Sequence, residues 1–150
     1  MQKRELDMSL PVDLAPLVEA WQTANAAQLE ALPARSVGIS RVVACSSYLA
    51  EIMARYPDAL PALDAEGRLD RSLETGELNR LFAEAIDPQL DEAGCMRELR
   101  RLRHRELLRI VWRDLAGTVE VAETLHDLSA LADAAIRRAL IWSQHALAAS

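Results

Sequence analysis

The sequence predicts an all-α protein, a bundle of about five to six helices that ends in a long antiparallel helical hairpin. Three observations predict this class. Apolar residues make up 51% of the chain, and Ala and Leu dominate among them while Phe, Tyr and Trp are scarce. The apolar residues recur at helical spacing rather than in the alternation that is typical of strands. Several Pro and Gly residues divide these periodic segments from one another.

The N-terminal helices are predicted within residues 9–56. Ser9 to Pro11 are typical of a helix start, because proline is favourable in the first turn, where its missing N–H would have no partner. This first helix is expected to end near Pro33. A second helix begins around residues 37–40 and ends at Pro57, because the residue before a proline is disfavoured in the α conformation.

A broken connector is predicted at residues 57–76, where prolines and glycines interrupt the pattern. Residues 57–63 are expected to form a short helical piece, and the polar stretch after it is expected to be the most mobile part of the chain. The next helix is predicted at residues 77–87 and ends before Pro88. The whole chain is interpreted as a single helical domain or a fragment of one.

The helical hairpin is predicted at residues 91–149. Its first helix runs from about 91 to 116, where Gly117 permits the left-handed conformation that often follows a helix end. Thr118 is expected to cap the second helix. In that second helix, apolar residues alternate at intervals of four and three, as in the seam of a bundle: Val121, Leu125, Leu128, Ala132, Ala135, Ala139, Trp142 and Ala146. Leu131, Ile136 and Leu140 widen this stripe.

Arginines crowd the first helix of the hairpin, together with His104: Arg97, Arg100, Arg101, Arg103, Arg105, Arg109 and Arg113. Glu106 and Asp114 fall close to the apolar stripe of this helix, where an unpaired carboxylate would be costly. We therefore predict a structural ion network of Arg103, Glu106, Arg109, Arg113 and Asp114. The alternative for the arginines is contact with phosphate or with an acidic partner, and the structural interpretation is favoured because acidic residues lie three or four positions away.

Charge and motifs exclude several classes of function. A net charge of -6 argues against nucleic-acid binding, and no apolar run approaches the ~20 residues that span a bilayer. Cys45 and Cys95 lie apart without metal-ligand spacing, which favours reduced thiols in a cytoplasmic protein. The serines lack the setting of a hydrolase nucleophile. We therefore assign no catalytic, cofactor-binding or metal-binding residue in this chain.

One stretch of the hairpin resembles a known family closely. Residues 99–133 read LRRLRHRELLRIVWRDLAGTVEVAETLHDLSALAD. This text is similar to the glutamine synthetase adenylyltransferases, also called adenylyl-removing enzymes, and Trp112 before Arg113 and Asp114 is more like the N-terminal of the two related halves of that family. The resemblance extends over about residues 37–142. It implies the N-terminal helical segment of a large enzyme that attaches AMP to glutamine synthetase and removes it.

The resemblance also implies what this chain lacks. In the family, a nucleotidyltransferase domain follows such a helical segment, and its Ser-Asp-x-Asp element holds magnesium or manganese against the phosphates of ATP. No Asp-x-Asp occurs in this sequence, so we expect this chain to lack the nucleotidyltransferase domain. The chain alone is therefore expected to be a non-catalytic scaffold, with glutamine synthetase, a nitrogen-signalling regulatory protein and the missing domain as partners. The alternative is a free-standing helical module that binds glutamine synthetase or a regulator.

Overall fold

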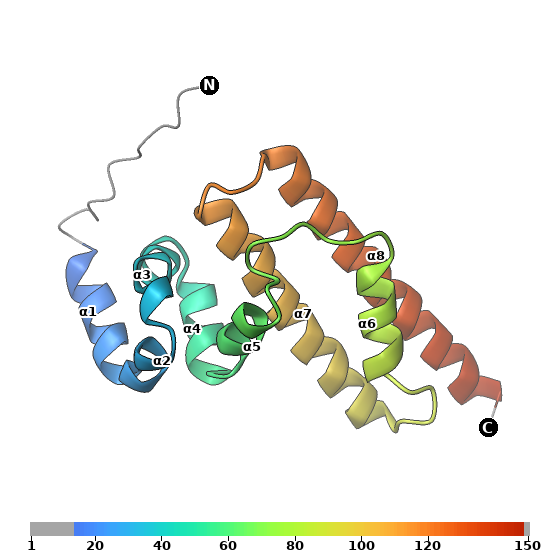
Figure 1. Cartoon of the computed structure of the whole chain (residues 1–150). Coiled ribbons are helices and arrows are strands. Elements are labelled where there is room, and N and C mark those ends of the chain that lie inside the picture. Colours follow the sequence, from blue (N-terminus) through green and yellow to red (C-terminus); the bar gives the residue numbers. More distant parts are fainter. Residues whose placement is uncertain (1–13, 149–150) are drawn as a thin grey trace. The chain divides into compact units, whose positions relative to one another are not determined.

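The computed structural model describes residues 14–148, and its helices confirm the all-α class (Figure 1). Over this range the chain forms eight α-helices and one 3-10 helix, with no residue in a strand. The helix start predicted at Ser9 to Pro11 lies outside the described residues. The bounds are α1 Ala15–Ala24, α2 Ala26–Ala31, η1 Pro33–Arg35, α3 Ser36–Cys45, α4 Ser47–Arg55, α5 Ala59–Ala65, α6 Glu77–Ala85, α7 Glu92–Leu115 and α8 Val121–Ala148.

The chain divides into two compact units, residues 1–61 and 62–150. In the first unit, α1 packs on α3 and α3 packs on α4. Aliphatic and thioether side chains fill the space between them, and Ile39 and Met53 are fully buried. Trp21 Nε1 donates a hydrogen bond to Ala50 O at 3.0 Å, which fastens α1 to α4.

The number of helices is larger than the apolar periodicity suggests because polar residues divide two of the predicted helices. Ser46 is extended, and its Oγ accepts a hydrogen bond from Leu49 N–H at 3.3 Å, so it caps α4 instead of continuing α3. Asn25 separates α1 from α2, and its side-chain amide donates to Trp21 O at 2.8 Å. Ser46 thereby supplies a partner for a backbone N–H in the first turn of α4.

The second unit is built on the antiparallel hairpin of α7 and α8, with α6 packed against both helices (Figure 1). The hairpin therefore forms as the sequence predicts. Arg138 on α8 donates to the carbonyls of Ala83 and Ile86 at the end of α6, and Trp142 Nε1 donates to Leu90 O at 2.8 Å. The core of this unit consists of Leu78, Phe82, Ile86, Cys95, Leu102, Ile110, Leu131 and Ala134.

The turn of the hairpin corrects one prediction. Gly117 adopts the expected left-handed conformation, with φ at 66°. Gly117 N–H and Thr118 N–H donate to Asp114 O and Arg113 O, which closes the end of α7. Thr118 Oγ1 also donates to Arg113 O at 3.0 Å. Thr118 therefore caps the C-terminus of α7, and the expectation that it caps α8 is wrong.

The part of the connector that follows α5, residues 66–76, begins with the same kind of turn. Gly67 has φ at 67°, and Arg68 N–H donates to Leu63 O at the end of α5. The reversal buries Leu69 and the side chain of Arg68. The polar stretch that the sequence marks as the most mobile part of the chain is therefore anchored by one apolar and one charged side chain.

The inner face of α8 differs from the predicted seam over the first half of the helix. Val121, Leu125 and Leu128 are exposed, whereas Leu131, at the side of the predicted stripe, is buried together with Asp127. The buried residues Asp127, Leu131 and Ala134 are also spaced by four and three, so spacing alone does not decide which side of the helix lies inside. The helix is thus rotated so that a charged residue, rather than its most apolar stripe, lies inside the hairpin.

Asp91 caps α7, because its Oδ1 accepts a hydrogen bond from Gly94 N–H at 2.8 Å. Asp91→Ala removes this acceptor, and we expect it to lower the free energy of unfolding by about 1 kcal/mol. Asp91→Asn is the matched control, since an amide oxygen also caps and should cost only a few tenths of that. Urea denaturation followed by far-ultraviolet circular dichroism measures both values. Equal losses for the two variants would contradict the capping role.

Candidate functional site

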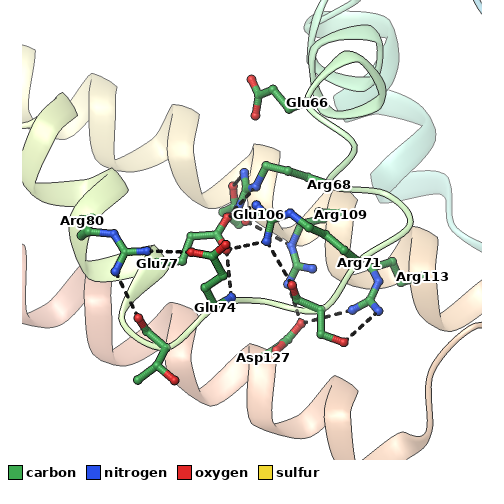
Figure 2. A network of polar contacts seen from close by, with 12 residues as sticks. Glu66, Arg68, Arg71, Glu74, Glu77, Arg80, Glu106, Arg109, Arg113 and Asp127 are labelled. Atoms are coloured by element: carbon green, nitrogen blue, oxygen red, sulfur yellow. Dashed lines mark hydrogen bonds and ion pairs between the residues drawn. The ribbon is translucent and has the colours of Figure 1, made fainter.

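Charged side chains from the connector, α6, α7 and α8 meet in the second unit (Figure 2). All but one are shielded from water at least in part, and Arg71, with 41% of its side chain exposed, lies at the edge of the group. Glu106, Arg109 and Arg113 lie three and four positions apart on α7 and share one of its faces. Asp127 on α8 lies opposite them. We call this group the buried network, and it consists of Arg68, Arg71, Glu77, Glu106, Arg109, Arg113, Glu123 and Asp127.

Glu106 is the most deeply buried carboxylate of the network, with 0% of the residue exposed. Arg68 binds it through two parallel hydrogen bonds, from Nη1 to Oε1 at 2.7 Å and from Nη2 to Oε2 at 2.9 Å. Such a fork matches the planar geometry of both groups and is among the stronger charge-assisted contacts in proteins. The contact joins residues that are 38 positions apart, so it closes the connector onto α7.

Glu77, the first residue of α6, receives both arginines of the connector. Arg68 Nε donates to it at 2.9 Å, and Arg71 donates from Nη1 and Nη2 at 2.8 and 2.9 Å. Glu74 N–H donates to it as well, at 2.9 Å. The hydrogen bonds from Arg71, against the opposing effect of burial, lower the pKa of Glu77 to about 2. This carboxylate is therefore ionised at any ordinary pH.

The network continues from α7 to α8 through two further arginines. Arg109 pairs with Glu106 at 3.3 Å and with Asp127 through a short contact. Arg113 Nη1 lies 2.6 Å from Glu123 Oε1 and 3.9 Å from Asp127 Oδ2. The hydrogen bond from Arg113 lowers the pKa of Glu123. Acidic and basic groups thus alternate from the connector to the second helix of the hairpin.

The buried network contains as many arginines as carboxylates, and this determines which chemical roles are open to it. Its guanidinium groups neutralise its carboxylates in direct contact, and this pairing offsets the cost of removing the charges from water. Among residues 14–148, no group of three or more His, Cys, Asp or Glu side chains is arranged to hold a metal ion. The carboxylates of the buried network are already bound by arginine. The arrangement is therefore suited to fixing the connector and the hairpin, and its donors do not fit a divalent metal.

The structure brings together three of the five residues predicted as an ion network. Glu106, Arg109 and Arg113 lie in the buried network. Arg103 and Asp114 lie on the exposed side of α7, and Asp114 Oδ1 accepts a hydrogen bond from Thr124 Oγ1 at 3.0 Å. Spacing along the sequence is thus not enough to predict which arginines pair with Glu106. The arginine must also lie on the buried face of α7.

The sequence pattern misses the contributions of the connector and of α8. Arg68 and Glu77 lie in or next to a segment without periodicity, which carries no signal for burial. Asp127 does leave a signal, because it lies four and seven positions before Leu131 and Ala134, the residues that α8 buries. A charged residue in register with a buried face predicts a partner of opposite charge on the facing helix.

The low pKa of Glu77 predicts how stability depends on pH. Its pKa in the folded chain, about 2, is below its ordinary value of 4.5, so its contribution is complete above about pH 4.5 and is lost as the pH falls toward 2. We expect the free-energy advantage of the wild-type chain over Glu77→Gln to shrink by about 3 kcal/mol across this window. Urea denaturation at a series of pH values measures it. An advantage that stays constant would contradict the assignment.

The fork between Arg68 and Glu106 predicts strong coupling between the two residues. Glu106→Leu leaves Arg68 and Arg109 without their shared carboxylate and should cost about 3–5 kcal/mol of the free energy of unfolding. The double variant Arg68→Leu with Glu106→Leu should cost less than the sum of the two single variants. Glu74→Gln, in an exposed ion pair with Arg80 at 3.3 Å, is the control and should cost less than about 1 kcal/mol. Additive losses in the double variant would contradict this account.

Comparisons with known proteins give the family of the chain. Residues 37–150 match the family model described as glutamate-ammonia ligase adenylyltransferase. Bifunctional glutamine synthetase adenylyltransferase/adenylyl-removing enzymes are similar to it: that of Thioalkalivibrio sulfidiphilus is 39% identical over 91% of this chain, that of Pseudomonas syringae 38% over 88%, and that of Pseudomonas aeruginosa 41% over 86%. No solved structure matches the chain.

The match covers most of this chain and only a small part of each relative. The chain spans 14%, 15% and 13% of the length of these three enzymes. Both the family model and the identities support the resemblance that residues 99–133 carry. The chain therefore belongs to the glutamate-ammonia ligase adenylyltransferase family.

Proposed function

We propose that this chain is the N-terminal helical part of an enzyme that adenylylates and deadenylylates glutamine synthetase, and that it serves there as a non-catalytic scaffold. The observation that carries the proposal is the family match over residues 37–150, to relatives whose names include both activities. The buried network supports the scaffold role, because its charged groups bind one another and hold the connector, α7 and α8 in one arrangement. We propose a cytoplasmic location alongside glutamine synthetase.

The chemistry of the parent enzyme is assigned to a domain outside this chain. The family resemblance implies ATP and magnesium or manganese, which the paired carboxylates of a nucleotidyltransferase domain would hold. The carboxylates described above do not fit that role, and no Asp-x-Asp occurs in the sequence. We therefore propose that the hairpin packs against that domain and positions it, and that none of the residues described here contacts the reacting phosphate.

The second candidate function is a helical interaction module that binds glutamine synthetase or a nitrogen-signalling regulatory protein. The first half of α7 favours it, because Arg97, Arg100 and Arg101 are exposed there. Glu98 lies within ion-pair distance of Arg97 and Arg101 and neutralises part of this charge. An acidic partner surface would complement the remainder. Neither candidate function requires a metal site in this chain.

The scaffold proposal predicts that the chain alone has no activity. The isolated chain, incubated with adenylylated glutamine synthetase, inorganic phosphate and magnesium or manganese, should release no adenylyl groups above a blank without the chain. The full-length enzyme from Pseudomonas aeruginosa is the positive control. Release that depends on both the metal and the chain would contradict the proposal.

Reading the gene beyond the codon for Ser150 separates the two candidates. An enzyme part predicts that the open reading frame continues into a Gly-rich strand and a Ser-Asp-x-Asp element. A stop codon followed by an unrelated gene supports the interaction module instead. In that case the chain should bind glutamine synthetase or the regulator directly, which isothermal titration calorimetry measures.

A further inference from the structure

The outer side of α8 carries an apolar stripe that the rest of the chain leaves exposed. We call it the outer stripe, and it consists of Val121, Leu125, Leu128, Ala132, Ile136 and Leu140. Leu125 is 59% exposed, Ile136 67% and Leu140 56%. Single exposed apolar residues are ordinary on protein surfaces, but a contiguous row of large ones marks a surface that contacts something.

The outer stripe is separate from the solvated side of α8. His126, Asp133 and Arg137 are exposed and lie together on another side of this helix, which supplies its polar face. Asp127 and Leu131 occupy the inner face toward α7. The helix α8 therefore has three sides: one faces α7, one is polar and solvated, and the third is the outer stripe, which is apolar but exposed.

The spacing of the outer stripe indicates that a helix covers it. Its residues follow one another at intervals of three and four, which is the pattern that packs one helix along another. Ala132 lies in the middle of the row, and its small side chain permits close approach of the neighbouring backbone. Because α8 pairs all its interior backbone groups internally, it offers only side chains and excludes addition of a β-strand.

The length of the relatives indicates where this helix comes from. The chain corresponds to 14% of the enzyme from Thioalkalivibrio sulfidiphilus, so most of such a polypeptide lies outside it. A segment of the same polypeptide is present at high effective concentration and needs no separate encounter. We propose that an amphipathic helix from the remaining part of the parent polypeptide docks on the outer stripe. This proposal rests on the proposed function and names the face of the hairpin that the scaffold uses.

Thiol reactivity at the outer stripe tests the docking. Leu125→Cys is placed in a Cys45→Ala background, because Cys45 is exposed, whereas Cys95 is buried and burial raises the pKa of its thiol. Arg137→Cys on the polar side is the matched control. Ellman's reagent should label both variants rapidly in the isolated chain. In the full-length parent polypeptide, Leu125→Cys should react at least about tenfold more slowly, while Arg137→Cys keeps its rate.

Each other outcome overturns the docking proposal in a distinct way. Equal rates of Leu125→Cys in both polypeptides show that the outer stripe stays uncovered. Protection in the isolated chain that disappears on dilution assigns the surface to a second copy, and protection that persists on dilution assigns it to another part of this chain. Because labelling does not depend on activity, a protected but inactive full-length polypeptide refutes only the proposed function. An active polypeptide without protection refutes only the docking.

Discussion

The fork between Arg68 and Glu106 is the contact on which the second unit depends. A carboxylate with no exposed surface is tolerated only when a charged partner and further hydrogen bonds replace water. Arg68 reaches Glu106 because the turn at Gly67 redirects the chain at the end of α5. The ion pair with Glu106 on α7 therefore fixes the position of the connector. It also fixes the start of α6, because Glu77 binds the same guanidinium group.

Ion pairs act together with apolar burial in setting the arrangement of these segments. The inner face of α8 contributes Leu131 and Ala134 to the core, and Ala130, Ala135 and Trp142 pack against it. Apolar contacts are non-directional, and alanine-rich faces would pack in several registers. Arg109 bound to Asp127 and Arg113 bound to Glu123 select one register of α8 on α7. We infer that the network contributes specificity of packing in addition to any stability.

The sequence predicts the parts of this arrangement that lie within one helix. Glu106, Arg109 and Arg113 share a face of α7 by spacing alone, and the sequence predicts arginine partners for Glu106 near the apolar stripe. The spacing does not predict the role of Arg68, because its partner Glu106 lies 38 positions away and the connector around Arg68 has no helical periodicity. The helix start at Ser46 involves a single side-chain hydrogen bond, which periodicity does not report. The family resemblance of residues 99–133 is independent of these details and is confirmed.

The network and the outer stripe are two consequences of one rotation of α8. A surface helix ordinarily turns its most apolar side inward. In this chain the inner side carries Asp127, which the arginines of α7 bind, and Arg138, which donates to the carbonyls at the end of α6. These polar contacts hold the helix in an orientation that hydrophobic burial within the hairpin alone would not select. The apolar residues displaced from the interior then form a continuous surface on the outside, which the docking of a further helix proposed above would cover.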